Sequence, residues 1–280
     1  MDRLLLVDGS NLLFQMFFGM PARIINAQGK AIQGTLGFVG ALLKIIRRVR
    51  PTHVAVLFDG EHENERATLD ETYKSNRIDY SQVEEEDSPF SQLPDVYEAL
   101  DFLKIRHAET EECETDDWMA GYALEYGGQT EVVIASFDSD FFQLLNDKVS
   151  VLRYRGERTQ VCTPEFLREK WGISPEQYAD FKSLTGDPSD NIKGAGKIGP
   201  KTAAELLQKF GSLEEILCRV EEISKPSVRA SLLQSADRLR VNYQMIKLTG
   251  CGKLPFALSA LEFKDGGWST TEVLREIGLR

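Results

Sequence analysis

Three mainly apolar runs in the first half of the chain are each followed within two residues by an aspartate. These are residues 4–7 before Asp8, residues 53–58 before Asp59, and residues 131–136 before Asp138. Apolar runs of this length, bounded by turn-forming residues, predict strands of a parallel sheet that is buried on both faces. The carboxyl ends of parallel strands lie along one edge of a sheet, where α/β proteins bind ligands. The pattern therefore predicts that these three carboxylates meet at one edge.

Apolar residues spaced three or four apart predict helices between these strands. Over residues 34–50 this spacing places aliphatic side chains on one face, and Pro51 ends the helix. We also predict helices over about 95–103, 114–124 and 141–145, and short strands near residue 105 and over 149–152. From residue 164 onward the pattern is helical. The order predicts an α/β fold in which a parallel-containing central sheet with flanking helices precedes a helical C-terminal subdomain.

Residues 61–92 differ in composition from the runs around them. They are charged, poor in aliphatic side chains, and include the acidic run at residues 84–87. Such a composition is typical of a solvated segment, because it offers little apolar surface to bury. We therefore predict a mobile excursion from the sheet, with Tyr73, Lys74 and Arg77 near the end of a short helix.

The bulk composition is that of a soluble globular protein. The chain has 280 residues, of which 42% are hydrophobic, and a mean hydropathy of −0.28. No apolar run approaches the roughly 20 residues that a membrane span needs, and the N-terminus lacks the pattern of a signal peptide. The four cysteines share no metal-ligand spacing. We expect them to be reduced thiols in a cytoplasmic protein.

The formal net charge of −11 is unusual for a protein that binds nucleic acid. A cluster of ligand carboxylates can account for much of it. Removing nine such groups from the 44 acidic residues leaves 35, against 33 basic residues. The charge therefore neither excludes nor supports a nucleic-acid partner.

Six further carboxylates are expected close to the same edge, four at predicted helix starts and two beside a turn. They are Glu114, Asp116, Asp117, Asp140, Asp187 and Asp190. Taken singly, such residues are usually helix caps or turn residues. Nine carboxylates at one edge would repel one another unless cations neutralised them. Because carboxylate oxygens suit Mg²⁺ or Mn²⁺, we predict a two-ion site of the kind that cleaves phosphodiester bonds.

Residues 185–203 join two of these aspartates to a glycine-rich turn. The chain passes Gly194, Gly196 and Gly199 and then enters an Ala- and Leu-rich helix. Glycines before a helix let backbone N–H groups approach a phosphate, although a surface loop before an ordinary helix has the same appearance. The sequence contains no rival site. Its three histidines lack zinc-ligand spacing, and it has no nucleophile elbow, Walker lysine or dinucleotide-binding glycine motif.

The acidic and basic motifs follow one another in a characteristic order over about residues 4–250. They are Leu-Val-Asp8-Gly, Phe-Asp59, Arg66 with Tyr73-Lys74-x-x-Arg77, Glu114-x-Asp116-Asp117, Asp138-x-Asp140-x-x-Gln-Leu-Leu and Gly-Asp187-x-Ser-Asp190-Asn-Ile. This set resembles the 5′-nuclease family, which includes the 5′→3′ exonuclease domain of bacterial DNA polymerase I and the flap endonucleases. The resemblance implies a PIN-like fold and two-metal, structure-specific hydrolysis of DNA near a 5′ end, in replication and repair.

The resemblance also implies a role for each residue. One metal would be held by Asp8, Asp59, Glu114 and Asp116, and the other by Asp140, Asp187 and Asp190, with Asp117 and Asp138 close to both. Lys74 and Arg77 would bind the scissile phosphate, and Tyr73 would pack near the DNA end. Contacts with DNA are implied for Arg66, Gly194, Gly196, Lys197, Gly199 and Lys201.

The implied architecture has a nuclease core over 1–163, with an arch or clamp at about 61–92. A DNA-binding subdomain would cover 164–280, with a helix–hairpin–helix at about 183–212 and a K⁺ ion that bridges its carbonyls to phosphate. The implied partner is DNA with a 5′ end, flap, nick or overhang, or an RNA–DNA hybrid, and no membrane. We expect a monomeric, stand-alone nuclease, since no polymerase region follows.

Three departures from the family pattern each remove or move a basic or glycine feature. Ser139 stands where the family commonly has a lysine, residues 61–63 are Glu-His-Glu where a lysine is common, and Lys197 occupies an expected glycine position. Two rival functions remain open. An RNA-cleaving nuclease on a similar acidic sheet usually lacks the hairpin, and a non-catalytic reader of DNA structure would be expected to lose at least one of the nine acids.

Overall fold

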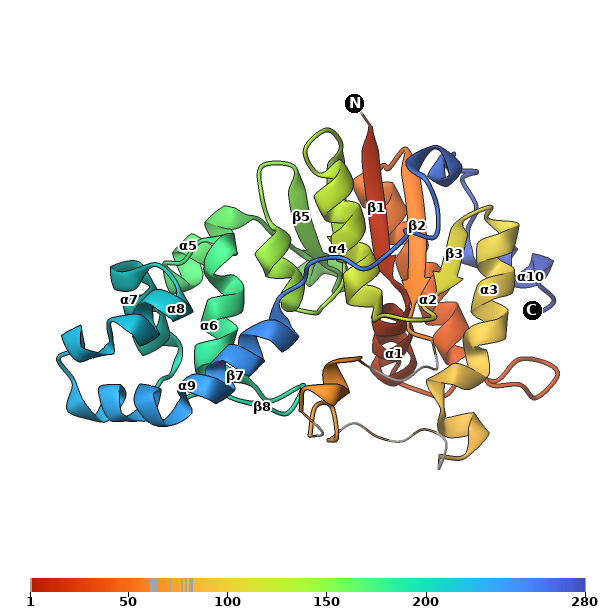
Figure 1. The fold of residues 1–280 in the computed structure, drawn as a ribbon. Helices are drawn as coiled ribbons and strands as arrows, with labels where there is room; N and C mark the ends of the chain where they lie inside the picture. Colours follow the sequence, from red (N-terminus) through yellow and green to blue (C-terminus); the bar gives the residue numbers. More distant parts are fainter. Residues whose placement is uncertain are drawn as a thin grey trace.

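The computed structural model describes residues 2–60, 65–70, 72–76, 78, 80 and 83–279. The strands are β1 (Arg3–Asp8), β2 (His53–Phe58), β3 (Arg106–Glu109), β4 (Glu131–Ala135), β5 (Val149–Arg153), β6 (Gln160–Cys162), β7 (Gly186–Asp187) and β8 (Ile192–Lys193). The α-helices are α1 (Gly9–Gly19), α2 (Gln33–Val49), α3 (Leu93–Phe102), α4 (Thr115–Tyr126), α5 (Pro164–Trp171), α6 (Tyr178–Thr185), α7 (Pro200–Phe210), α8 (Leu213–Cys218), α9 (Pro226–Ile246) and α10 (Thr270–Glu276). Figure 1 shows a central sheet with helices on both faces and a helical lobe beside it.

Six strands form one sheet in the order β3-β2-β1-β4-β5-β6. All neighbouring strands are parallel except β5 and β6, which are antiparallel. Because β1 lies between β2 and β4, the ends of these three strands are neighbours along one edge. The predicted α/β fold is confirmed, and the topology brings Asp8, Asp59 and Asp138 to the same edge.

Alternate side chains of β1, β2, β4 and β5 enter two different cores. Leu4 and Leu6 of β1 face a core that includes Met119 of α4, whereas Leu5 and Val7 pack with the side chains of α2 and α3. Burial on both faces is the reason that these four strands are mainly apolar runs. Each fully buried aliphatic side chain stabilises the fold by roughly 1.5–3 kcal/mol. The sheet is therefore a firm support for polar groups at its edge.

The helical lobe shares the first of these cores. Leu184 of α6, Leu207 of α7 and Leu239 of α9 belong to the same buried cluster as the α4-facing side chains of β1. This shared core fixes the turn between β7 and β8 relative to the sheet. The division of the chain into 1–163 and 164–280 stays a prediction.

The segment after α9 crosses α4 and returns to the sheet, and α10 packs against α2 and α3 (Figure 1). The crossing brings Cys251 beside Cys113, and the two form a disulfide although they are 138 residues apart. The expectation of four reduced thiols is therefore wrong for this pair, while Cys162 and Cys218 are free. The spacing of the cysteines carried no signal, because only the crossing brings them together.

Several elements differ from the sequence-based predictions. The sequence predicts only a turn after Asp8, but α1 follows at once, because the Asp8 side chain accepts a hydrogen bond from the N–H of Asn11 and caps the helix. The predicted helix over 141–145 is a 3₁₀ helix, Asp140–Leu144. Strands β6, β7 and β8 are too short for a periodic pattern. Among the described residues, no helix has the length and apolar character to cross a membrane.

Candidate metal centre

Asp8 lies at the end of the central strand and is buried. Its carboxylate accepts hydrogen bonds from the backbone N–H of Asn11 at 3.0 Å and from the hydroxyl of Ser136 at 2.7 Å. Burial, and then the nearby charge of Asp59, raise the pKa of Asp8 to about 7. A negative charge at this position is therefore costly without a cation close by.

Asp59, Asp116 and Asp138 surround Asp8 from three different elements. Asp59 follows β2 and accepts a hydrogen bond from the N–H of Thr115 at 3.1 Å, which fixes the start of α4 against the sheet. Burial, and then the charges of Asp138 and Asp8, raise the pKa of Asp116 well above its ordinary value. These four carboxylates are close enough to repel one another, which is the arrangement that favours a divalent cation.

A second carboxylate cluster lies further along the same edge. Oxygen atoms of Asp140, Asp187 and Asp190 lie within 4.8 Å of one another, and all three residues are buried. Asp138 links this cluster to the first, because its carboxylate accepts the N–H of Asp140 at 2.7 Å. The structure therefore places two adjoining groups of carboxylate oxygens at one edge.

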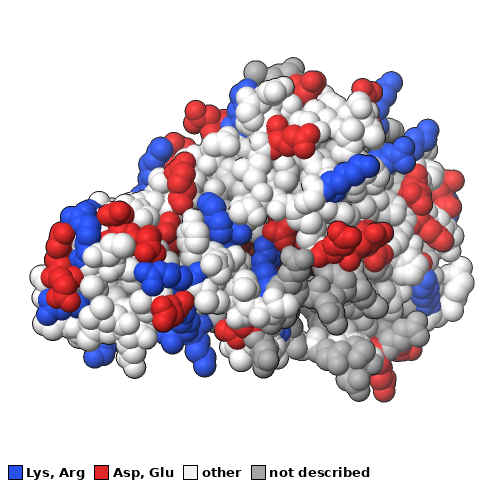
Figure 2. Space-filling model, in the orientation of Figure 1, with Lys and Arg blue, Asp and Glu red and all other residues white. Residues whose placement is uncertain are grey.

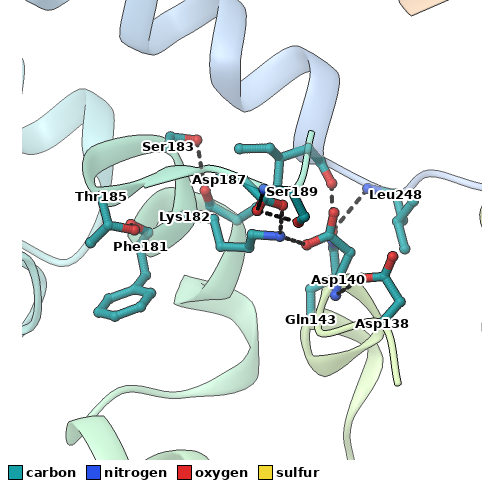
Figure 3. Close-up of polar contacts among 12 residues, drawn as sticks. Asp138, Asp140, Gln143, Phe181, Lys182, Ser183, Thr185, Asp187, Ser189 and Leu248 are labelled. Carbon is teal, nitrogen blue, oxygen red and sulfur yellow. Dashed lines mark hydrogen bonds and ion pairs between the residues drawn. The ribbon is translucent and has the colours of Figure 1, made fainter. Parts of the chain in front are cut away.

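The ammonium group of Lys182 lies between Asp140 and Asp187 and donates to both carboxylates (Figure 3). Although burial opposes its charge, the two carboxylates raise the pKa of Lys182 above its ordinary value. The pKa of Asp187 is lowered, because the Lys182 charge outweighs the opposing effect of burial. Lys182 therefore supplies the positive charge of the second cluster. Sequence reasoning missed it, since a single lysine in a helical stretch carries no distinctive signal.

Three side chains from residues 66–74 converge on Glu114. Arg66 and Lys74 form ion pairs with Glu114, and the hydroxyl of Tyr73 donates to it at 3.3 Å. Arg66 also pairs with Asp117 at 2.7 Å, and its side chain is only 12% exposed. In the structure Arg66 and Asp117 thus neutralise each other, and the contact of Arg66 with DNA stays a prediction.

Residues 72–76 pack against the turn that carries Asp190. Hydrogen bonds join the N–H of Lys74 to the Asp190 carbonyl at 3.0 Å, Asn191 Nδ2 to the Thr72 carbonyl at 2.9 Å, and Asn76 Nδ2 to the Pro188 carbonyl at 3.0 Å. Lys74 has a φ of 55°, an uncommon conformation for a residue with a side chain. These bonds hold Lys74 beside both clusters. Arg77 lies outside the described residues, as does part of the arch predicted over 61–92.

The turn between α6 and α7 contains the predicted hairpin residues. A Cβ on Gly194 would lie 2.4 Å from the carbonyl carbon of Thr185, so this position requires glycine. Lys197 has a φ of 63°, the left-handed conformation in which glycine is usual. Its backbone therefore keeps the conformation that a glycine would have at this position. Gly196, Lys197, Gly199 and Lys201 are exposed. They are accessible to a ligand, and their contact with a duplex stays a prediction.

The affinity for divalent ions is expected to fall as the pH drops below 7. Burial is the main reason that the pKa values of Asp8 and Asp140 are raised to about 7, and a carboxyl group must lose its proton to bind a cation. Each proton released should therefore cost about tenfold in affinity per pH unit below 7. Calorimetric titration of EDTA-treated protein with MgCl₂, in buffers of different ionisation enthalpy, measures the affinity and the number of protons released. A pH-independent affinity without proton release would contradict the prediction.

The fold and the acidic edge define an α/β protein with two adjoining carboxylate clusters suited to divalent cations. The chain belongs to the 5′-3′ exonuclease family. The family's N-terminal resolvase-like domain matches residues 3–172, and its C-terminal SAM fold matches residues 173–267. The resemblance identified from the motifs is confirmed.

Bacterial DNA polymerases I are similar to this chain along most of its length. DNA polymerase I of Bacillus subtilis (strain 168) is 33% identical over 276 residues, which cover 97% of this chain and 30% of that protein. The thermostable DNA polymerase I of Thermus thermophilus is 35% identical over 247 residues, which cover 88% of this chain and 28% of that protein. This chain therefore spans less than a third of the length of these relatives.

Solved structures of nucleases share the fold. The T5 D15 protein co-crystallised with metal ions has a TM-score of 0.71 and is 25% identical, over 87% of this chain and 88% of that one. Human GEN1 in complex with Holliday junction DNA has a TM-score of 0.62 and is 16% identical, over 99% of this chain and 66% of that one. At that identity the likeness to GEN1 concerns the fold alone.

Proposed function

We propose that this chain is a structure-specific 5′ nuclease, which hydrolyses phosphodiester bonds near the 5′ end of DNA as a 5′→3′ exonuclease and flap endonuclease. The observation that carries the proposal is the pair of carboxylate clusters joined by Asp138, with the ammonium of Lys74 beside them. Two-ion sites of this kind stabilise both the attacking and the leaving oxygen of a phosphodiester. Membership of the 5′-3′ exonuclease family supports the same reaction.

The donor set fits two hard divalent cations, because every predicted ligand is a carboxylate and the pKa values of Asp8, Asp116 and Asp140 are raised. We assign one ion to Asp8, Asp59, Glu114 and Asp116 and the other to Asp140, Asp187 and Asp190, with Asp138 close to both. Mg²⁺ is the proposed ion and Mn²⁺ the alternative. Such ions would supply an activated water and neutralise charge on the phosphate. A ligand role for Asp117 requires Arg66 to release it.

Lys74 would stabilise the negative charge that develops on the scissile phosphate. Its ammonium lies at Glu114 and 4.9 Å from the centre of the Tyr73 ring, which limits its freedom. Its backbone is tied to the second cluster through Asp190. A cation positioned before the substrate arrives stabilises a transition state without a reorganisation cost. Arg77 would contribute a second positive charge to the same phosphate.

The turn over residues 194–201 would bind the duplex backbone while the strand with the 5′ end enters the metal centre. In Figure 2 the Lys and Arg side chains on the lower edge of the helical lobe, near α9 and β8, alternate with acidic groups. We infer that duplex binding depends on a few positioned contacts. The proposed substrates are DNA flaps, nicks and overhangs, with RNA–DNA hybrids as secondary substrates. We further propose that the protein is monomeric and cytoplasmic, and that it acts in replication and repair.

Cleavage of a 5′-labelled DNA flap tests the proposed function. With MgCl₂ the protein should release short 5′ products from the flap and from a nicked duplex, and both EDTA and Asp138→Ala should prevent this. Binding of the flap without cleavage, in Mg²⁺ and in Mn²⁺, would favour the non-catalytic reader of DNA structure. Faster cleavage of a matched RNA flap would favour the RNA-cleaving nuclease.

A further inference from the structure

Polar side chains along one face of α9 donate hydrogen bonds to three backbone carbonyls of the turn between α6 and α7. Ser231 Oγ donates to the Gly196 carbonyl at 2.5 Å, Arg238 Nη2 to the Gly194 carbonyl at 3.0 Å, and Asn242 Nδ2 to the Lys193 carbonyl at 3.0 Å. The three donors are spaced seven and then four residues apart, so they share one face of the helix. α9 therefore runs along the turn as a row of hydrogen-bond donors.

The remaining carbonyl of this stretch also has a protein donor. The Ala195 carbonyl accepts the N–H of Ile198 at 3.3 Å. Each carbonyl from residue 193 to residue 196 therefore accepts a hydrogen bond from the chain itself. A monovalent cation at the Gly194 carbonyl would lie beside the guanidinium of Arg238, and at the Lys193 carbonyl it would share the oxygen with the side-chain amide of Asn242. Two like charges at one carbonyl repel each other, so these residues do not fit the K⁺ ion that the family resemblance implies.

Arg238 is placed to carry positive charge at the surface of the turn. Its Nη2 atom also donates to Ser235 Oγ at 3.0 Å, and Ser235 is buried, so the guanidinium is anchored at one corner. Within the part of the chain that the structure describes, Nε and Nη1 of Arg238 donate no hydrogen bond, and the residue is exposed. Those donors are available for a phosphate, for which a planar guanidinium is well suited.

We propose that α9 replaces a monovalent cation in this turn, and that Arg238 both fixes the Gly194 carbonyl and binds a phosphate of the duplex. The proposal rests on the proposed function only in taking duplex DNA as the ligand. Ser231 and Asn242 complete the replacement by holding the carbonyls on either side. Duplex binding should therefore be independent of K⁺ and should depend on Arg238.

Binding of a fluorescently labelled blunt duplex, measured by anisotropy with Ca²⁺ in place of Mg²⁺, tests the inference. The wild-type affinity should be the same within about twofold in KCl and in tetramethylammonium chloride of equal ionic strength, since no bound K⁺ is involved. Arg238→Met should weaken binding by about fivefold in both salts. It should also reduce the slope of log affinity against log salt concentration by about the amount that one phosphate contact contributes. Arg238→Lys should recover part of the affinity.

Arg240→Met is the matched control. Arg240 is exposed on the same helix two residues further on, but it pairs with Glu214 and contacts none of the turn carbonyls described above. A loss of wild-type affinity on removal of K⁺ would overturn the replacement of the ion. Equal affinities of Arg238→Met and Arg240→Met would overturn the phosphate contact, and a wild-type protein that binds no duplex would overturn both. Intact binding without flap cleavage would instead overturn only the proposed function.

Discussion

Asp138→Asn is expected to lower the rate of flap cleavage by at least about a thousandfold, equivalent to about 4 kcal/mol of transition-state stabilisation. Asp138 is the residue that joins the two clusters. Burial is the main reason that the pKa values of Asp8, Asp116 and Asp140 are raised, and the charge of Asp138 adds to each increase. Its carboxylate also accepts the N–H of Asp140. Removing its charge should weaken both ion sites together. Asparagine keeps the shape and can still accept that hydrogen bond, so the fold should persist.

Single-turnover cleavage of a labelled flap at saturating enzyme measures the effect, and calorimetry with MgCl₂ shows the weaker ion binding. Asp147→Asn is the matched control, because Asp147 is exposed and precedes β5, at the opposite edge of the sheet. Its rate should equal that of the wild type. A rate for Asp138→Asn within tenfold of the wild type would show that the two clusters do not work as one centre.

Lys74→Met should lower the single-turnover rate by about a hundredfold and weaken flap binding by no more than about threefold. The physical reason is the position of the ammonium, which is held at Glu114 and beside the Tyr73 ring before any substrate binds. A positive charge there gains most when negative charge accumulates on the phosphate. Methionine keeps most of the length of the side chain and removes only the charge.

Lys104→Met provides an unusually close comparison for Lys74→Met. Lys104 also has a left-handed backbone, with a φ of 57° against 55° for Lys74, and it lies after α3. Any general effect of replacing a lysine in this conformation should appear in both variants. Equal losses of rate and affinity in Lys74→Met would mean that Lys74 acts in substrate binding, and not in the chemical step.

The position of the first carboxylate cluster was predictable because it follows from the topology of parallel strands. Once residues 4–7, 53–58 and 131–136 are strands of one parallel sheet, the aspartates after them must share an edge. The strand order that makes β1 the central strand is a tertiary fact, but any parallel order leaves these ends on the same side. The fold class and the acidic edge were therefore within reach of pattern reasoning.

The charges that balance this edge were not predictable, because helices from distant parts of the chain deliver them. Lys182 lies five residues before Asp187, but it reaches Asp140 only because α6 packs against the 3₁₀ helix that begins at Asp140. Arg66 was expected at DNA, yet it is paired with Glu114 and Asp117. Periodicity reports which face of a helix is buried, but it does not report which distant polar group that face meets.

By itself, the sequence determined the strands β1 to β5, the acidic ends of three of them and the glycine-rich turn at residues 185–203, since each depends on neighbouring residues and on the general geometry of parallel sheets. Only the tertiary structure decided that Arg238 of α9 lies on the Gly194 carbonyl and that Cys251 reaches Cys113. These contacts join residues that are 44 and 138 positions apart in the sequence. They arise from the packing of the helical lobe and the return of the chain across α4, which no local pattern encodes.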